Sequence, residues 1–327
     1  MRRGSNYIII LLLTLLWLPA KSQQLPIFSQ YVMNGFILNP AMAGYDGFTS
    51  VNTTARQQWL GIKDAPQTFS ASWQTRVLAR SYRIIGHPVR ERNMLLPSTK
   101  GRVGLGAYVI NDVNANMART GLQFAYAYHI ILDNHQLSFG LAGKVFQYRI
   151  ADENLSFGRD EDPLIKAGIR FVGYIPDVDF GMYWTNTNYF IGASVNNLVQ
   201  TRINSSKTVL DIRVIRHYWL MGGYRFNIRE ELAIEPNVML KTTEQWIPQL
   251  DIGAKVFYEE DLWAGLAFRT DGSLITLLGL RNRGLFVGYS FDLSFTSIQR
   301  FNYGTHELSI SYKFGDDARR YRWIRRY

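Results

Sequence analysis

The sequence contains no cysteine in its 327 residues. Without a thiol the chain can form no disulfide, no thiolate metal site and no cysteine nucleophile, and the absence fits an oxidising compartment. Long apolar runs are also lacking, because no stretch beyond residue 22 approaches the roughly 20 apolar residues of a membrane-spanning helix. If the mature chain lies in a membrane, it must therefore cross it with strands.

Metal-binding motifs are absent as well. The acidic cluster at residues 160–162 lacks the alternating ligands and the turn glycine of a calcium loop, which favours a solvated loop. The histidines show no recognised ligand spacing; they are His87, His129, His135, His217 and His306. The sequence predicts no metal and no cofactor.

Catalytic signatures are equally weak. The glycines of residues 101–106 stand in a strand-like stretch with no helix after it, so they indicate strand packing rather than a phosphate cradle. Ser309, His306 and Asp292 could form a hydrolase triad, but a chain of this length offers such sets by chance. We therefore expect a protein that is not an enzyme.

The positive charge of the chain does not indicate nucleic-acid binding. The net charge is +10, and much of the excess lies in residues 76–92 and in the arginines of residues 319–326. No recognition helix or RNA-binding signature accompanies these stretches. A nucleic-acid partner is thus excluded, and the terminal arginines are expected to contact lipid headgroups or a periplasmic secretion component.

The first residues have the layout of a signal peptide. Arg2 and Arg3 precede an apolar run over residues 7–18, and Ala20 and Ser22 provide small residues for cleavage before Gln23. The apolar run is too short for a span, although an uncleaved anchor is the alternative. We expect residues 1–22 to be a signal peptide.

Apolar side chains alternate with small or polar ones from residue 49 to residue 314, in segments of about ten residues. One such stripe runs along every second position of residues 122–132 and another along residues 232–240. The opposite faces carry charges, which suits a wet lumen; they include Asp251, Lys255, Arg269, Asp292 and Glu307. Aromatic residues, 14% of the chain, recur near the stripe ends, as in membrane girdles. A soluble β-sandwich or propeller stays open as the alternative.

Connections favour a closed barrel. Short turns are predicted on one side, at residues 133–134, 187–188, 229–230, 259–260 and 282–283. Longer links on the other side span residues 150–166, 197–212 and 296–303, although the long link 78–100 falls on the short-turn side. The predicted fold class is all-β: a closed antiparallel transmembrane β-barrel of about 14 strands with an N-terminal irregular segment.

The predicted organisation has four parts: signal peptide 1–22, N-terminal plug or docking segment 23–48, outer-membrane barrel 49–315 and basic periplasmic tail 316–327. Residues 28–44 are expected to fold into or beneath the barrel. The alternative is that the prolines and glycines there merely shape the approach to the first strand.

Several motifs in this order resemble the PorP/SprF family of outer-membrane proteins associated with type IX secretion in Bacteroidota. They are Phe28-Ser29-Gln30-Tyr31, Asn34, Asn39-Pro40-Ala41-Met42-Ala43-Gly44, Arg56-Gln57-Gln58-Trp59-Leu60-Gly61 and Ala65-Pro66-Gln67-Thr68. The resemblance covers nearly the whole mature chain. The stretch of residues 76–92 and the tail beyond Phe314 look like departures from the family pattern.

The resemblance implies an outer-membrane barrel that assists export or surface anchoring of a large secreted adhesin. The implied partners are that adhesin or its C-terminal domain, other type IX secretion components and outer-membrane lipid. The charged lumen face leaves a passive diffusion or uptake channel as the alternative. The candidate partner-binding residues are Phe28, Gln30, Tyr31, Asn39, Pro40, Trp59, Arg269 and Glu307.

Overall fold

The computed structural model describes residues 28–31, 33–77, 102–132, 135–150, 171–204, 211–259 and 261–314. The predicted signal peptide, the acidic cluster at 160–162 and the basic tail 316–327 lie outside these residues. Most of the basic stretch 76–92 lies outside them too.

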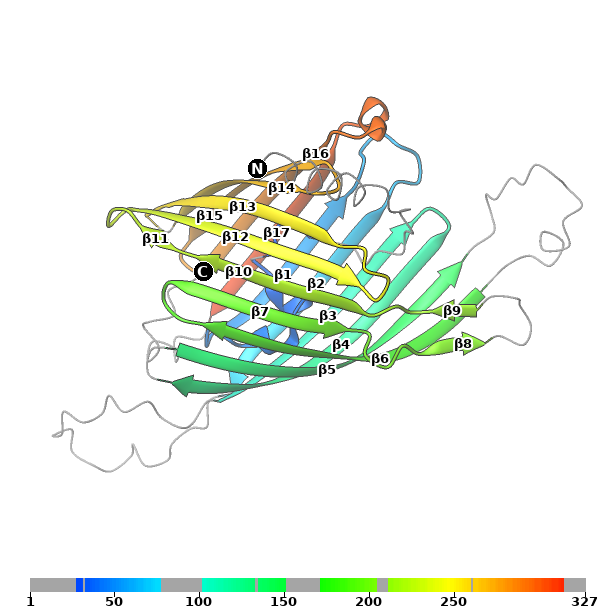
Figure 1. Cartoon of the computed structure of the whole chain (residues 1–327), viewed down its shortest axis with the longest axis horizontal. Coiled ribbons are helices and arrows are strands. Elements are labelled where there is room, and N and C mark those ends of the chain that lie inside the picture. Colours follow the sequence, from blue (N-terminus) through cyan, green and yellow to red (C-terminus); the bar gives the residue numbers. More distant parts are fainter. Residues whose placement is uncertain are drawn as a thin grey trace, which may run out of the picture.

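A single antiparallel sheet closes on itself into a barrel (Figure 1). The strands pair in chain order, and β1 closes the ring against β17, with Thr49 opposite Phe314. The first seven are β1 (Thr49–Gln57), β2 (Gln67–Val77), β3 (Val103–Asn114), β4 (Met117–Leu132), β5 (His135–Ile150), β6 (Phe171–Thr185) and β7 (Tyr189–Asn196). The others are β10 (His217–Tyr224), β12 (Leu232–Thr243), β13 (Gln249–Tyr258), β14 (Leu262–Arg269), β15 (Ser273–Asn282), β16 (Leu285–Ser294) and β17 (Thr305–Phe314).

These strands number 14, so the predicted fold class and strand count are confirmed. The short β11 (Phe226–Asn227) continues β10 along the same neighbour, β12. A separate ribbon of β8 (Arg202–Asn204) and β9 (Asp211–Arg213) extends from the link between β7 and β10. Among the described residues no helix has both the length and the apolar character needed to cross a membrane.

The alternating pattern gives the wall two chemically different faces. Along β4, Leu122, Phe124 and Tyr126 are exposed on the outside, whereas Gln123 and His129, at odd-numbered positions, are fully buried on the inside. The predicted lumen-facing charges also lie inside and are buried. Because strand side chains point alternately to opposite faces, period two in the sequence produces this apolar outer surface directly.

The links divide between two rims. At the turn rim, residues 133–134, 186–188, 228–231, 259–261 and 283–284 join consecutive strands, as predicted. The loop rim carries the longer links 58–66, 151–170, 197–216 and 295–304, but also the tight links 115–116 and 270–272, so the predicted contrast is only partly right. Val77 and Val103 pair at the turn rim, so β2 ends and β3 begins on that side; the predicted long link 78–100 lies outside the described residues.

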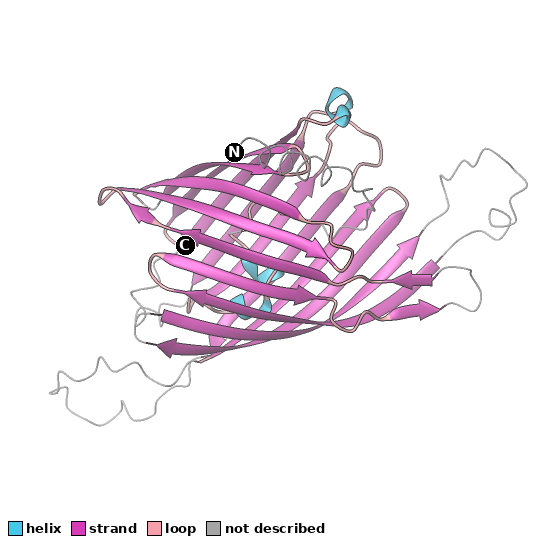
Figure 2. Ribbon diagram, in the orientation of Figure 1, coloured by secondary structure: helices cyan, strands magenta, loops and turns pink. Residues whose placement is uncertain are grey.

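Residues 28–48, here called the plug, lie inside the barrel. Two short 3₁₀ helices, η1 (Gly35–Ile37) and η2 (Pro40–Met42), stand within the ring of strands (Figure 2). Their side chains join the wall in one buried cluster that includes Phe36, Leu38 and Met42. The lumen is therefore packed with the chain's own N-terminal residues.

Candidate functional site: an N-terminal plug and its anchors

The plug runs along the lumen from the loop rim to the turn rim. Near its start, Ser29 contacts Arg56 and Glu307, which stand at the loop-rim ends of β1 and β17. Near its end, Asp46 accepts a hydrogen bond of 2.7 Å from Lys313 at the turn-rim end of β17. The chain thus enters β1 only after passing through the barrel that β1 helps to build.

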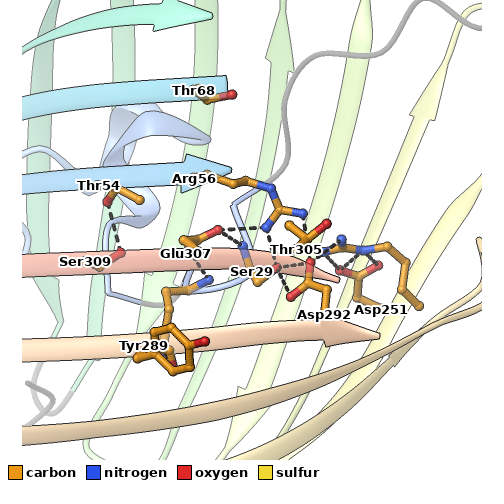
Figure 3. A network of polar contacts seen from close by, with 12 residues as sticks. Ser29, Thr54, Arg56, Thr68, Asp251, Tyr289, Asp292, Thr305, Glu307 and Ser309 are labelled. Carbon is orange, nitrogen blue, oxygen red and sulfur yellow. Dashed lines mark hydrogen bonds and ion pairs between the residues drawn. The ribbon is translucent and has the colours of Figure 1, made fainter. Parts of the chain in front are cut away.

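Two backbone N–H groups of the plug grip one carboxylate at the outer end. Ser29 N donates to Glu307 Oε2 at 2.7 Å (Figure 3), and Gln30 N donates to Glu307 Oε1 at 2.8 Å. The Ser29 hydroxyl donates to Asp292 Oδ2 at 2.7 Å and accepts from Arg56 Nη1 at 2.8 Å. The name outer anchor is used below for Ser29, Gln30, Arg56, Asp292 and Glu307.

The acidic groups of the outer anchor share their cations with a neighbouring ion pair of the wall. Arg56 bridges Asp292 (2.8 Å) and Glu307 (2.9 Å), and Asp292 also lies 3.6 Å from Arg269. Arg269 in turn binds Asp251 at 2.8 Å. All five side chains are at most 6% exposed. Because an unpaired buried charge is costly, this pairing is what allows five ionisable side chains inside one wall.

In the middle, the plug makes neutral hydrogen bonds to the wall. Gln30 Nε2 donates to the carbonyl of Tyr289 at 3.0 Å, and Tyr31 OH donates to Asn237 Oδ1 at 2.7 Å. Burial, with the nearby Asp251 carboxylate, raises the pKa of Tyr31 above its ordinary value of 10.0. The phenol therefore stays protonated and remains a donor.

The side chain of Asn39 caps η2 and also binds the barrel wall. Its Oδ1 accepts from Ala41 N at 3.0 Å, which caps η2, and Pro40 stands in the first helical position, where a missing N–H costs nothing. Its Nδ2 donates to the carbonyls of Met182 (2.8 Å) and Ala193 (3.3 Å), on β6 and β7. One side chain thus fixes both the local fold and its position.

The inner half of the plug lies on glycines of the wall. A Cβ added to Gly104 would stand 1.9 Å from the carbonyl oxygen of Ala43, and one added to Gly140 would stand 2.2 Å from Ala41 N. The name inner cradle is used for Gly104 and Gly140. The interpretation of the 101–106 glycines as residues that ease strand packing is thereby corrected for Gly104: it makes room for the plug backbone.

The candidate residues are largely brought together. Arg269 and Glu307 share one charged network in the wall, and Trp59 lies apart from it in the loop-rim link 58–66. Five candidates belong to the plug: Phe28, Gln30, Tyr31, Asn39 and Pro40. Their predicted contact with a partner stays a prediction.

Ser29 and Arg56, both central to the outer anchor, were not singled out from the sequence. Both stand inside motifs that resemble the family, next to Gln30 and near Trp59, and this position is the feature of the sequence that could have identified them.

The lumen-facing charges of the outer anchor are paired and buried, so the expectation of a wet lumen is wrong at this level. The Ser309, His306 and Asp292 set is not assembled either. Ser309 and Asp292 are buried inside the wall, whereas His306 stands on the outer face and bonds the Tyr289 hydroxyl at 2.7 Å.

Comparison with known proteins gives a clear family match. The family model described as "Type IX secretion system membrane protein PorP/SprF" matches residues 20–312. No curated protein matches the chain.

Similar solved structures include Acinetobacter baumannii Omp33 (10% identity, TM-score 0.44, 82% of this chain and 98% of that one). The Ralstonia pickettii toluene transporter TbuX is similar at 11% identity, TM-score 0.47, over 90% of this chain and 95% of that one. A Pseudomonas aeruginosa FadL homologue is similar at 9% identity, TM-score 0.46, over 89% and 95%.

Proposed function

Because the chain belongs to the PorP/SprF family of type IX secretion system membrane proteins, we propose that it assists export or surface anchoring of a large partner adhesin. It is an outer-membrane β-barrel, and other type IX secretion components are its expected neighbours. In this proposal it acts by binding rather than by catalysis.

The filled lumen is the observation that favours a docking role. A diffusion channel needs a continuous polar path, yet the plug spans the lumen and is held by buried contacts at both ends. Charges that could have lined such a path are instead paired with one another at the outer anchor. These contacts support a closed barrel whose surfaces bind partners, and they weigh against the alternative of a passive channel.

The test is a knockout strain complemented with the wild-type gene. The surface proteome is measured by protease shaving and mass spectrometry, together with uptake of small solutes. We expect one large adhesin to disappear from the cell surface of the knockout and to return on complementation, while solute uptake is unchanged. An uptake defect with all adhesins present would refute the proposal and favour the channel.

A second strain tests the plug. It carries a barrel that lacks residues 28–34 and therefore the plug half of the outer anchor. Reduced adhesin display, at an unchanged amount of barrel in the outer membrane, is the expected result. Normal display would remove the plug from the proposed role.

A further inference from the structure

Two links at the loop rim are joined into one unit. Leu60 N donates to the carbonyl of Gly304 at 2.8 Å, and Tyr303 N donates to the carbonyl of Leu60 at 2.7 Å. Trp59 N also donates to the hydroxyl of Thr305, the first residue of β17, at 3.2 Å. Links 58–66 and 297–304, here called the loop platform, are thus tied together by backbone hydrogen bonds. They stand together at the top of Figure 1.

The loop platform has a fixed shape. Trp59 (φ 46°) and Asp64 (φ 56°) adopt left-handed backbone conformations that non-glycine residues rarely take. Gly61 (φ 101°) lies under the ring of Tyr303, where an added Cβ would stand 3.0 Å from the ring. Such conformations persist only where the surroundings hold them, so the platform is preorganised.

Large apolar side chains are exposed on this fixed surface. Tyr303 is 76% exposed, Phe301 74% and Leu60 43%. Aromatic side chains held rigidly in water mark interaction surfaces, and they lose little conformational entropy when a partner covers them.

Lipid does not explain their exposure. Gln57, at the loop-rim end of β1, pairs with Gln67 of β2 on one side and with His306 of β17 on the other. These three side chains form a polar row on the outer face of the wall, directly below the platform. Hydrocarbon does not tolerate such a row, so the apolar layer ends beneath it and the platform stands in the aqueous phase.

We propose that the loop platform is the docking surface for an apolar patch on the exported adhesin, an inference that rests on the proposed function. The loop rim faces the cell exterior in barrels whose short turns are periplasmic, which is where an exported protein arrives. The platform continues into β1 and β17, which carry Arg56 and Glu307. A partner seated there lies next to the outer end of the plug.

The experiment compares two variants in the full-length barrel. Phe301→Ser with Tyr303→Ser removes the exposed aromatic rings of the platform. Trp246→Ser is the matched control, because Trp246 is 80% exposed on the separate loop-rim link 244–248. The probe is the tagged adhesin that the knockout loses from its surface. Its affinity for each purified barrel is measured in detergent, and its surface level is measured in cells.

We expect at least about tenfold weaker binding and reduced surface display for the platform variant, with the control unchanged. Unchanged binding by the platform variant refutes docking at the loop platform but does not affect the proposed function. Equal losses in both variants also overturn it, since exposed aromatics in general would then be responsible. If the platform variant has a lower thermal stability in lipid vesicles but binds the adhesin as tightly as wild type, the rings are lipid anchors and docking is refuted. A knockout that loses no adhesin refutes the proposed function itself, whatever the platform does.

Discussion

The two ends of the plug are held in different ways. At the outer anchor, attraction dominates, since two carboxylates and one guanidinium bind the N–H and hydroxyl groups of Ser29 and Gln30. At the inner end, shape adds to polar contacts such as that of Lys313 with Asp46, since Gly104 and Gly140 of the inner cradle present no side chain where the plug backbone approaches.

The difference teaches what each end recognises. The outer anchor binds backbone N–H groups, which any peptide carries. A glycine cradle accepts only a chain that follows the same path closely. The predictions below separate the two means of attachment.

Arg56→Ala should have the largest effect. It leaves the buried carboxylates of Asp292 and Glu307 without their shared cation, which costs about 3–5 kcal/mol of unfolding free energy. Guanidinium-induced unfolding in detergent micelles measures the loss. Arg56→Lys keeps the charge without the two-pronged geometry and should lose less. A loss below about 1 kcal/mol for Arg56→Ala would show that the outer anchor is solvated like a surface ion pair.

Gly104→Val tests the inner cradle. The new side chain would overlap the carbonyl of Ala43, so the plug must shift, at a cost of about 1–3 kcal/mol. We expect the displaced plug to raise the conductance of the barrel in planar bilayers. Gly143→Val is the matched control, because a Cβ at Gly143 of β5 meets no atom within 4 Å. Equal conductance in the two variants would contradict the shape argument.

Asn39→Ala should cost about 1–2 kcal/mol, because it removes both the cap of η2 and the donor to the Met182 carbonyl. Asn39→Ser separates the two contributions. Serine can still cap the helix but is too short to reach the wall, so an unfolding free energy midway between wild type and Asn39→Ala is expected. A serine variant as stable as wild type would mean that the wall contact contributes nothing.

Much of the fold could be predicted from the sequence, because period two is a local property of each strand. Leu122 and Phe124 face outward for the same reason that Gln123 faces inward. The plug anchors are different. Ser29 and Asp292 are 263 residues apart, and only the closed ring brings them together. Gly104 illustrates the same limit, since its purpose depends on a backbone segment some 60 residues earlier in the chain.

Tyr31→Phe should have the smallest effect, about 1 kcal/mol, because it removes one neutral hydrogen bond to Asn237. The pH dependence makes this small effect identifiable. Burial raises the pKa of Tyr31 in the folded barrel above 10.0, so its contribution is complete below that pH and falls as the pH rises further. The difference in unfolding free energy between wild type and Tyr31→Phe should therefore be constant from neutral pH to about 9 and shrink above 10. Measuring both proteins in the same buffers cancels the titration of every other group. A difference that grows above pH 10 would mean that the folded barrel holds Tyr31 as a phenolate, and the middle of the plug would then be held by charge as the outer anchor is.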